Sequence, residues 1–397
     1  MPAAMHLGVR ITVQITLGLL LLTPVLLAIS IYSPARIVNR SRAVEPPDPA
    51  AGKLAAPKAA RPLLGVAINA HHIGDLDLYL ESVDQIAALG ANALVVVTPM
   101  FQTQIDSNRI RYLARKCPNP RQLVAILRRG RDRGLHTTLL PIVLIEFPGE
   151  KEWRGVIRPA DWDAWWASYD RFIDHFVDIA VAADVDLLAI GSELNSTEDQ
   201  VDRWQRVIDR VRRRFTGRLT YAANWDRYDQ VAIWPLLDVM SVSAYFELVP
   251  EEQEATVATL QAAWGLQRDR LLEFALRWER PLFLSEVGYP SLPLAAAHPW
   301  NYVASDTTTA DHEAQARCYR AFFGAWRDAL ADADSGALGV CCYHWDPYHH
   351  GDSSDTGYGV QGKPAVKVIE HAFAEIRTAV ESPDQPPATR GSAPDDR

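Results

Sequence analysis

The stretch VDLLAIGSELNSTEDQVDRWQRVIDRVRRRFTGRLTYAAN (185–224) contains one complete strand–helix–strand unit. Residues 185–191 are a short apolar run of the kind that forms a buried strand. Residues 201–215 carry apolar side chains at helical spacing, and residues 218–224 form a second run with strand character. A strand, a helix and a further strand in this order predict two parallel neighbours in one sheet.

The same alternation repeats on both sides of this stretch. The runs with strand character are 63–69, 93–98, 136–145, 185–191, 218–224, 237–245, 281–287 and 337–345. Helical patterns follow them at about 78–89, 123–127, 165–182, 201–215, 254–278, 313–330 and 365–376, with only a short helix near residue 230. Eight strand–helix units in series predict an α/β fold, a single (β/α)8 or TIM barrel, in which chemistry collects at the carboxyl ends of the strands.

Both ends of the chain differ from this central region. Residues 11–31 are apolar and uncharged, long enough to span about 30 Å of hydrocarbon. We therefore predict a signal peptide or an uncleaved signal-anchor helix over 1–32, and a secreted or membrane-anchored protein that faces outside the cytoplasm. Residues 33–62 are rich in Pro and Ala and predict a disordered linker. The barrel is expected over 63–380, and 381–397 predict a disordered tail.

Composition narrows the class of function. With 40 Lys and Arg against 49 Asp and Glu, the net charge of −9 argues against nucleic-acid binding. No P-loop or dinucleotide fingerprint is present, and the four Cys contain no C-x-x-C pair. The histidine pairs at 71–72 and 349–350 lack a diagnostic metal-ligand spacing, so no metal or cofactor is expected. The twelve Trp suit core packing and also stacking on sugar rings.

Two glutamates, Glu193 and Glu286, each end an apolar run that should otherwise be buried. A single Glu there often only marks where a strand reaches water. Two of them, after the fourth and seventh expected strands, favour function because these strands lie on opposite sides of the barrel mouth. Hydrolysis of a glycosidic bond uses such a pair, since one carboxylic acid protonates the departing oxygen while the other carboxylate attacks the anomeric carbon. Glu146 and Glu247 also follow expected strands and compete for these roles.

Other polar and aromatic side chains are expected at the same rim. Tyr245 ends the sixth expected strand, where its hydroxyl would help to keep Glu286 ionised. On the last strand, Cys341 and Cys342 should point in opposite directions, one into the barrel and one toward the helices. Further substrate-binding candidates at or just beyond strand ends are Asn69, Asn195, Asn224, Trp225 and Trp345.

Three motifs carry a resemblance to a known family: EKEWRGVIRPADWDAWWASY (150–169), IGSELN (190–195) and LSEVGYPS (284–291). They resemble clan A of the retaining glycoside hydrolases and, within it, glycoside hydrolase family 113, whose characterised members are β-mannanases acting on β-1,4-linked mannan. The resemblance implies that Glu193 is the general acid/base and Glu286 the nucleophile. It also implies that Tyr245 orients the nucleophile and that Trp345 forms a floor under the sugar. Trp153 and Arg154 would line the substrate cleft.

Two positions depart from the clan pattern. Ser192 stands where many members carry an Asn that contacts the sugar 2-hydroxyl, and Asn195 or Asn224 could compensate. The stretch VVVTPMFQTQ (95–104) ends with Gln102 and Gln104, without the Arg that is usual after the second strand.

The sequence thus leads to two hypotheses. The first is a retaining glycoside hydrolase that cleaves a β-linked polysaccharide or oligosaccharide, with β-1,4-mannan as first candidate. The alternative is a non-hydrolytic carbohydrate-binding or polysaccharide-assembly protein on the same barrel. Both imply a carbohydrate partner and a contact with the membrane through the N-terminal segment, and we expect a monomer. Which sugar is cleaved, and whether inside or at the end of its chain, stays open at this stage.

Overall fold

The computed structural model describes residues 61–301, 303, 308–348 and 351–382. The predicted signal or anchor segment, nearly all of the predicted linker and nearly all of the predicted tail lie outside the described residues, as do His349 and His350. Within these ranges, no helix combines the length and the apolar character that a membrane span requires.

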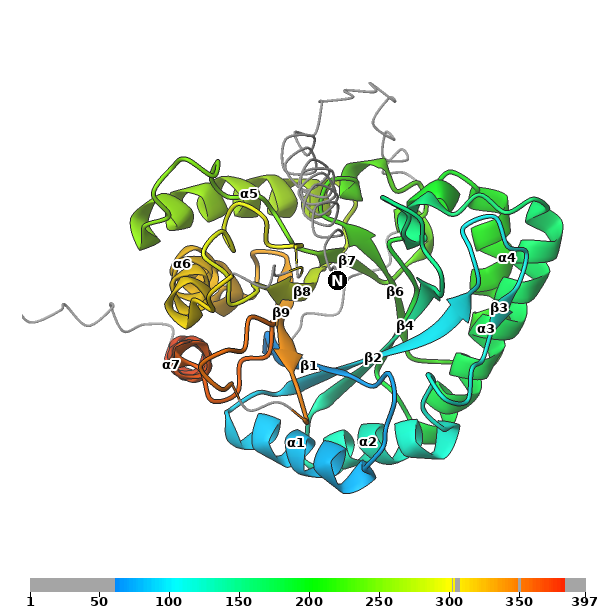
Figure 1. The fold of residues 1–397 in the computed structure, drawn as a ribbon, viewed down its shortest axis with the longest axis horizontal. Helices are drawn as coiled ribbons and strands as arrows, with labels where there is room; N and C mark the ends of the chain where they lie inside the picture. Colours follow the sequence, from blue (N-terminus) through cyan, green and yellow to red (C-terminus); the bar gives the residue numbers. More distant parts are fainter. Residues whose placement is uncertain (1–60, 302, 304–307, 349–350, 383–397) are drawn as a thin grey trace, which may run out of the picture. The chain divides into compact units, whose positions relative to one another are not determined.

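Eight parallel strands close into a barrel, with helices arranged around it (Figure 1). Closure comes from β1, which pairs in parallel with β2 on one side and with β9 on the other. One short strand, β3, adds to the end of β2 in the antiparallel direction. The strands are β1 Leu63–Asn69, β2 Ala93–Gln102, β3 Ile110–Arg111, β4 His136–Ile145, β5 Leu187–Ser192, β6 Arg218–Asn224, β7 Val239–Ser243, β8 Leu282–Gly288 and β9 Ala337–Trp345.

The helices begin where the sequence offers a polar cap. Asp161, for example, accepts hydrogen bonds from the backbone of Asp163 and Ala164 and so satisfies two N–H groups that the helix leaves unpaired. Asp75, Asn119, Thr256 and Asp311 cap four other helices in the same way. The α-helices are α1 Leu76–Ala88, α2 Pro120–Asp132, α3 Trp162–Ala183, α4 Val201–Arg212, α5 Val257–Arg277, α6 His312–Ala331 and α7 Pro364–Glu381.

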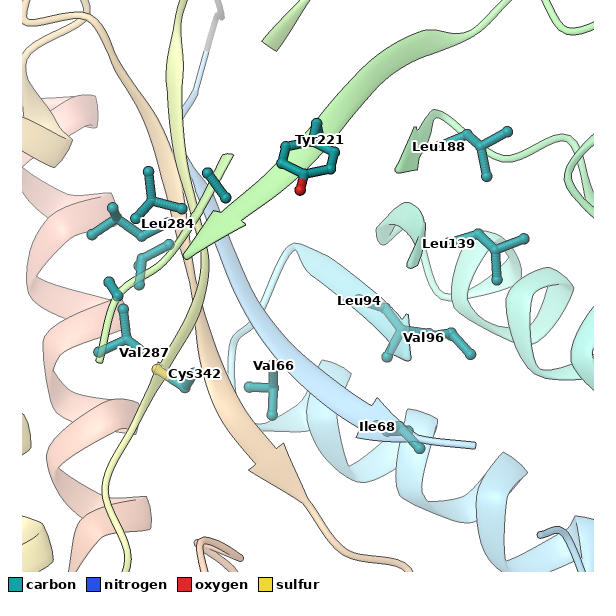
Figure 2. Close-up of a cluster of buried hydrophobic side chains, with 14 of the residues drawn as sticks. Val66, Ile68, Leu94, Val96, Leu139, Leu188, Tyr221, Leu284, Val287 and Cys342 are labelled. Atoms are coloured by element: carbon teal, nitrogen blue, oxygen red, sulfur yellow. The ribbon is translucent and has the colours of Figure 1, made fainter. Parts of the chain in front are cut away.

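The buried apolar side chains form two layers, because successive strand residues point to opposite faces. An inner cluster fills the barrel with side chains from all eight of its strands. An outer, larger cluster lies between the strands and the helices, and Figure 2 shows part of it, including Val66, Leu188 and Leu284. Cys341 belongs to the inner cluster and Cys342 to the outer one, which confirms the predicted alternation.

The prediction of a single (β/α)8 barrel is confirmed, with local differences. The sixth barrel strand, β7, ends at Ser243, so Tyr245 lies two residues beyond it. Between β6 and β7 the chain forms two short 3-10 turns, Tyr228–Gln230 and Trp234–Leu236. The pairing of β1 with β9 shifts register, because a step of two residues from Val66 to Ile68 lies opposite a step of three residues from Cys342 to Trp345. Such a bulge reverses the inward and outward alternation at the end of β9.

Candidate active site

Glu193 lies directly after β5, at the carboxyl end of the barrel. Its backbone φ is 51°, in the left-handed region that residues other than glycine rarely adopt. The Glu193 N–H donates to the carbonyl of Ala222 on β6 over 2.8 Å, and the residue is only 7% exposed. Its Oε2 lies 2.6 Å from Nη2 of Arg154. A buried carboxylate on strained backbone points to a functional position, because such strain persists where function requires it.

Glu286 lies within β8 and faces Ser243 of β7 in the strand register. It is 5% exposed, and its Oε2 accepts a hydrogen bond of 2.8 Å from the hydroxyl of Tyr245. Burial, reinforced by the negative charge of Glu193, raises the pKa of Glu286 to about 7, while the charge of Arg154 and the Tyr245 hydrogen bond act in the opposite direction. The structure therefore brings Glu193 close enough for its charge to affect the ionisation of Glu286.

Arg154 is the cation shared by these two carboxylates. It begins a 3-10 turn, Arg154–Val156, in the loop between β4 and α3. Its guanidinium pairs with Glu193 and also acts electrostatically on Glu286. Arg154 thus provides a guanidinium beside both carboxylates from the loop after β4. Gln102, at the end of β2, is fully buried and instead donates to the backbone carbonyls of residues 104 and 105.

Tyr343 and Tyr358 complete the surroundings of Glu286, and the sequence analysis missed both. Their rings lie 5.6 Å apart, and the Tyr245 ring lies 6.3 Å and 6.1 Å from them. The Tyr343 hydroxyl accepts a hydrogen bond of 2.7 Å from the side-chain amide of Asn69. Asn69 therefore reaches the site through Tyr343. Burial and the charge of Glu286 raise the pKa of Tyr343, so it stays a neutral hydroxyl.

Trp345, expected under the sugar, lies two residues further along β9. It is 7% exposed and packs in the outer apolar cluster, whereas Tyr343 contacts the inner one. The register shift between β1 and β9 accounts for this difference, because it interrupts the period of two between the two residues. Tyr343 is therefore the β9 aromatic that neighbours Glu286.

The remaining substrate-binding candidates lie at or after the ends of β4, β5 and β6. Asn195 follows in a 3-10 turn, and its Oδ1 is buried without a hydrogen-bond partner among the described residues, as is Oγ of Ser192. Asn224 accepts the N–H of Trp225, and the Trp225 ring packs 5.7 Å from that of Phe246. Trp153 is half-buried and covers Gly155, where a Cβ would lie 2.4 Å from its ring.

A histidine joins the site from the loop after β1. Burial, together with the electrostatic influence of His344 and of the Arg154 guanidinium, lowers the pKa of His71 to about 4. His71 is therefore neutral at neutral pH, and its buried Nε2 has no partner among the described residues. A neutral imidazole of this kind can exchange a hydrogen bond with a sugar hydroxyl.

The two competing glutamates are engaged elsewhere at the rim. Glu146 accepts from Arg111 at 2.8 Å and from Lys116 at 3.0 Å. Glu247 is exposed and accepts from the indole N–H of Trp300 at 3.1 Å. Neither is buried against a second carboxylate in the way that Glu193 and Glu286 are. In the part of the chain that the structure describes, no cluster of three or more His, Cys, Asp or Glu side chains could hold a metal ion.

A (β/α)8 barrel with two buried glutamates at the ends of its fourth and seventh barrel strands defines a glycosidase. The sequence profile of glycoside hydrolase family 113 matches residues 78–363. The chain belongs to this family. A search of curated protein sequences gave no match.

Solved structures agree with this assignment. The family 113 β-mannanase AaManA from Alicyclobacillus acidocaldarius, in complex with ManMIm, is 25% identical with a TM-score of 0.70, over 80% of this chain and 99% of that one. Another family 113 β-1,4-mannanase is 22% identical with a TM-score of 0.69, over 79% and 99%. A family 5 glycoside hydrolase from Streptomyces cattleya, in complex with GlcNAc, shares the fold at 17% identity and a TM-score of 0.53, over 83% and 82%.

Proposed function

We propose that this protein is a retaining β-mannanase that uses Glu286 as nucleophile and Glu193 as general acid/base. The observation that carries the proposal is the buried pair itself, with Arg154 acting on both carboxylates and Tyr245 bonded to Glu286. Two glutamates in unlike surroundings suit two different roles.

In the first step, a carboxylate oxygen of Glu286 forms a bond to the anomeric carbon of the sugar. The bond from this carbon to the departing oxygen breaks, and that oxygen takes the proton of Glu193. Tyr245 and Arg154 favour the ionised form of Glu286 that this attack requires. The products are a glycosyl ester on Glu286, a released sugar and an ionised Glu193.

In the second step, Glu193 takes a proton from water while the water oxygen bonds to the anomeric carbon. The ester bond breaks and Glu286 leaves as a carboxylate, so both residues return to their first state. Arg154 can stabilise the negative charge on either residue, because it acts on both. Two inversions at one carbon preserve its configuration.

Mannan is the proposed substrate because the family 113 structures that this chain resembles are described as β-mannanases. A product profile over mannan, glucan and galactan oligosaccharides tests this choice, and cleavage of glucan alone would contradict it. Binding of a glycan with no release of product would instead support the non-hydrolytic alternative.

The roles of the two glutamates can be tested separately. Glu286→Ala should abolish hydrolysis, since no nucleophile remains. Glu193→Ala should retain slow turnover of a dinitrophenyl β-mannoside. Azide should accelerate it by bonding to the anomeric carbon of the glycosyl ester without base assistance, which releases Glu286 as a carboxylate and gives a β-glycosyl azide. Proton NMR of the first-formed product should show the β anomer. Normal hydrolysis by both variants would contradict the assignment.

We also propose that the enzyme acts outside the cytoplasm, because residues 11–31 are apolar and uncharged and polymeric mannan does not cross membranes. Fractionation of cells that express the full chain tests this location. Recovery in the cytosolic fraction alone would contradict it.

A further inference from the structure

A third buried acid, Glu198, lies close to the site but outside the set described above. It is 1% exposed and accepts a hydrogen bond of 2.9 Å from the hydroxyl of Tyr221 on β6. Tyr221 is itself fully buried within the outer cluster (Figure 2), with the rings of Trp204 and Trp234 at 5.6 Å and 6.3 Å. Packing alone does not explain a carboxyl group here, because burying one is costly.

The same tyrosine hydroxyl also binds the backbone next to Glu193. Its oxygen accepts the N–H of Leu194 over 2.7 Å. A hydroxyl has one hydrogen and can rotate about its C–O bond. Glu198 fixes the direction of that hydrogen, so a lone pair of the Tyr221 oxygen points toward Leu194. The carboxyl group thus acts on the Leu194 N–H through the hydroxyl.

Glu193 requires such support because its backbone is in the left-handed region. On one side, its own N–H is bonded to Ala222 on β6. On the other side, the peptide that links it to Leu194 is bonded to Tyr221, also on β6. The Leu194 carbonyl accepts the N–H and the hydroxyl of Thr197 at 2.8 Å and 2.7 Å, which fixes the next turn. Hydrogen bonds to β6 therefore fix both peptide groups that flank Glu193.

We propose that Tyr221 and Glu198 are positioning residues that hold the backbone of Glu193 in its strained conformation and so aim its carboxyl group at the departing oxygen. This inference rests on the acid/base role of Glu193 proposed above. Both side chains are buried, at 0% and 1% exposure, so the proposal gives neither of them a contact with the substrate. Arg227, whose Nε lies 3.6 Å from Oε2 of Glu198, limits the cost of burying the acid.

The test compares two leaving groups in Tyr221→Phe, which removes one oxygen and keeps the ring. A misplaced acid should lower kcat on mannotetraose by roughly 10- to 100-fold, with KM little changed. Formation of the glycosyl ester from dinitrophenyl β-mannobioside needs no proton, so that step should keep its rate. Hydrolysis of this glycosyl ester should slow, and azide should restore turnover of the dinitrophenyl substrate.

Tyr289→Phe is the matched control. It removes a fully buried hydroxyl that accepts from the Trp264 indole at 2.8 Å, away from the Glu193 backbone. The control should show no leaving-group dependence and no azide effect. Equal losses of kcat/KM, which reports ester formation, on both substrates in Tyr221→Phe, or unchanged kinetics, would overturn the proposal.

Variants of Glu198 provide a second line of evidence. Glu198→Ala should reproduce the Tyr221→Phe pattern, because the hydroxyl is free to rotate. Glu198→Gln should restore most of kcat, since its amide oxygen still accepts from Tyr221. An alanine variant with the kinetics of the parent would contradict the role of Glu198. Assays of the parent enzyme distinguish a failure of this inference from a failure of the proposed function, because a parent that does not hydrolyse mannan would refute the proposed function itself.

Discussion

Asp186 and Glu193 stand at opposite ends of β5, and their surroundings differ. Asp186 precedes the strand, is about one-third exposed, and accepts the N–H and hydroxyl of Thr137 at 2.8 Å and 3.1 Å. Arg131 lies 3.4 Å away. Asp238, which precedes β7, similarly accepts the Leu219 N–H at 2.7 Å. Acids at the amino-terminal ends of these strands thus have several donors each and remain in contact with water.

The acids at the carboxyl ends are more buried and less well paired. Glu193 and Glu286 are each less than a tenth exposed, and Arg154 is the cation that acts on both. An arrangement with two buried anions near one cation lowers stability. The cost of desolvating two carboxylates exceeds the favourable interaction energy that a single guanidinium contributes. The contrast indicates that one end of the barrel supports the fold, while the other tolerates instability for chemistry.

The largest expected effect comes from removing the shared cation. Arg154→Met keeps the aliphatic bulk but leaves two buried carboxylates unpaired, so the free energy of unfolding at pH 8 should fall by about 3–5 kcal/mol. Urea denaturation at pH 8 measures this loss. As the matched control, Arg131→Met removes a half-buried arginine at the opposite end and should cost no more than about 1 kcal/mol. Equal losses at the two ends would contradict the contrast.

The next effect is a dependence of stability on pH. Burial raises the pKa of Glu198 from 4.5 to about 7, despite the hydrogen bond from Tyr221 and the charge of Arg227. Between these two pH values the unfolded chain loses this proton while the folded protein keeps it, so stability falls as pH rises. Glu198→Gln removes this loss and should be more stable than the parent at pH 8. From pH 4 to pH 8, the difference in free energy of unfolding between the variant and the parent should shift in favour of the variant by on the order of 3 kcal/mol. Parallel stability curves for the two proteins would refute the prediction.

A smaller effect is expected from the hydrogen bond on Glu286, the proposed nucleophile. Tyr245→Phe removes the donor at 2.8 Å from Glu286 and should raise the pKa of that carboxyl further. In the proposed mechanism Glu286 attacks as a carboxylate, so the acidic limb of the kcat/KM profile should move to higher pH. Activity at pH 6 should fall by about 10- to 100-fold, the usual value of a hydrogen bond to a charged group. An unchanged acidic limb would show that this hydroxyl does not act on Glu286.

The barrel and its two glutamates could be predicted from local patterns. Apolar runs set the strands, and the end of a run identified Glu193 and Glu286 as charged residues at one rim. The left-handed backbone at Glu193 was not visible, because a Glu carries no signal for positive φ. Tyr221 was hidden for a different reason, since a tyrosine in an apolar strand cannot be told from core.

Other features depend on contacts that strand patterns do not encode. Tyr343 was missed because the register shift between β1 and β9 changes which residues share a face, and no local sequence signal marks that shift. Arg154 was placed near the substrate by resemblance alone. Its pairing with Glu193 joins two loops 39 residues apart in the sequence, counting from 154 to 193. Such pairings are set by the closed barrel rather than by the segments that contribute to it.

The smallest expected effect comes from a substitution at the amino-terminal end of β5, which allows the two ends of this strand to be compared directly. Asp186→Ala leaves the buried N–H of Thr137 without its acceptor, so unfolding should become easier by about 2 kcal/mol. Because Asp186 lies at the amino-terminal end of the strand, kcat/KM on mannan should stay within about twofold of the parent. Glu193→Ala at the other end should do the reverse, with hydrolysis of mannan lost and thermal stability unchanged or higher, since it removes a buried charge. A loss of activity in Asp186→Ala without a loss of stability would show that the division between the two ends is wrong.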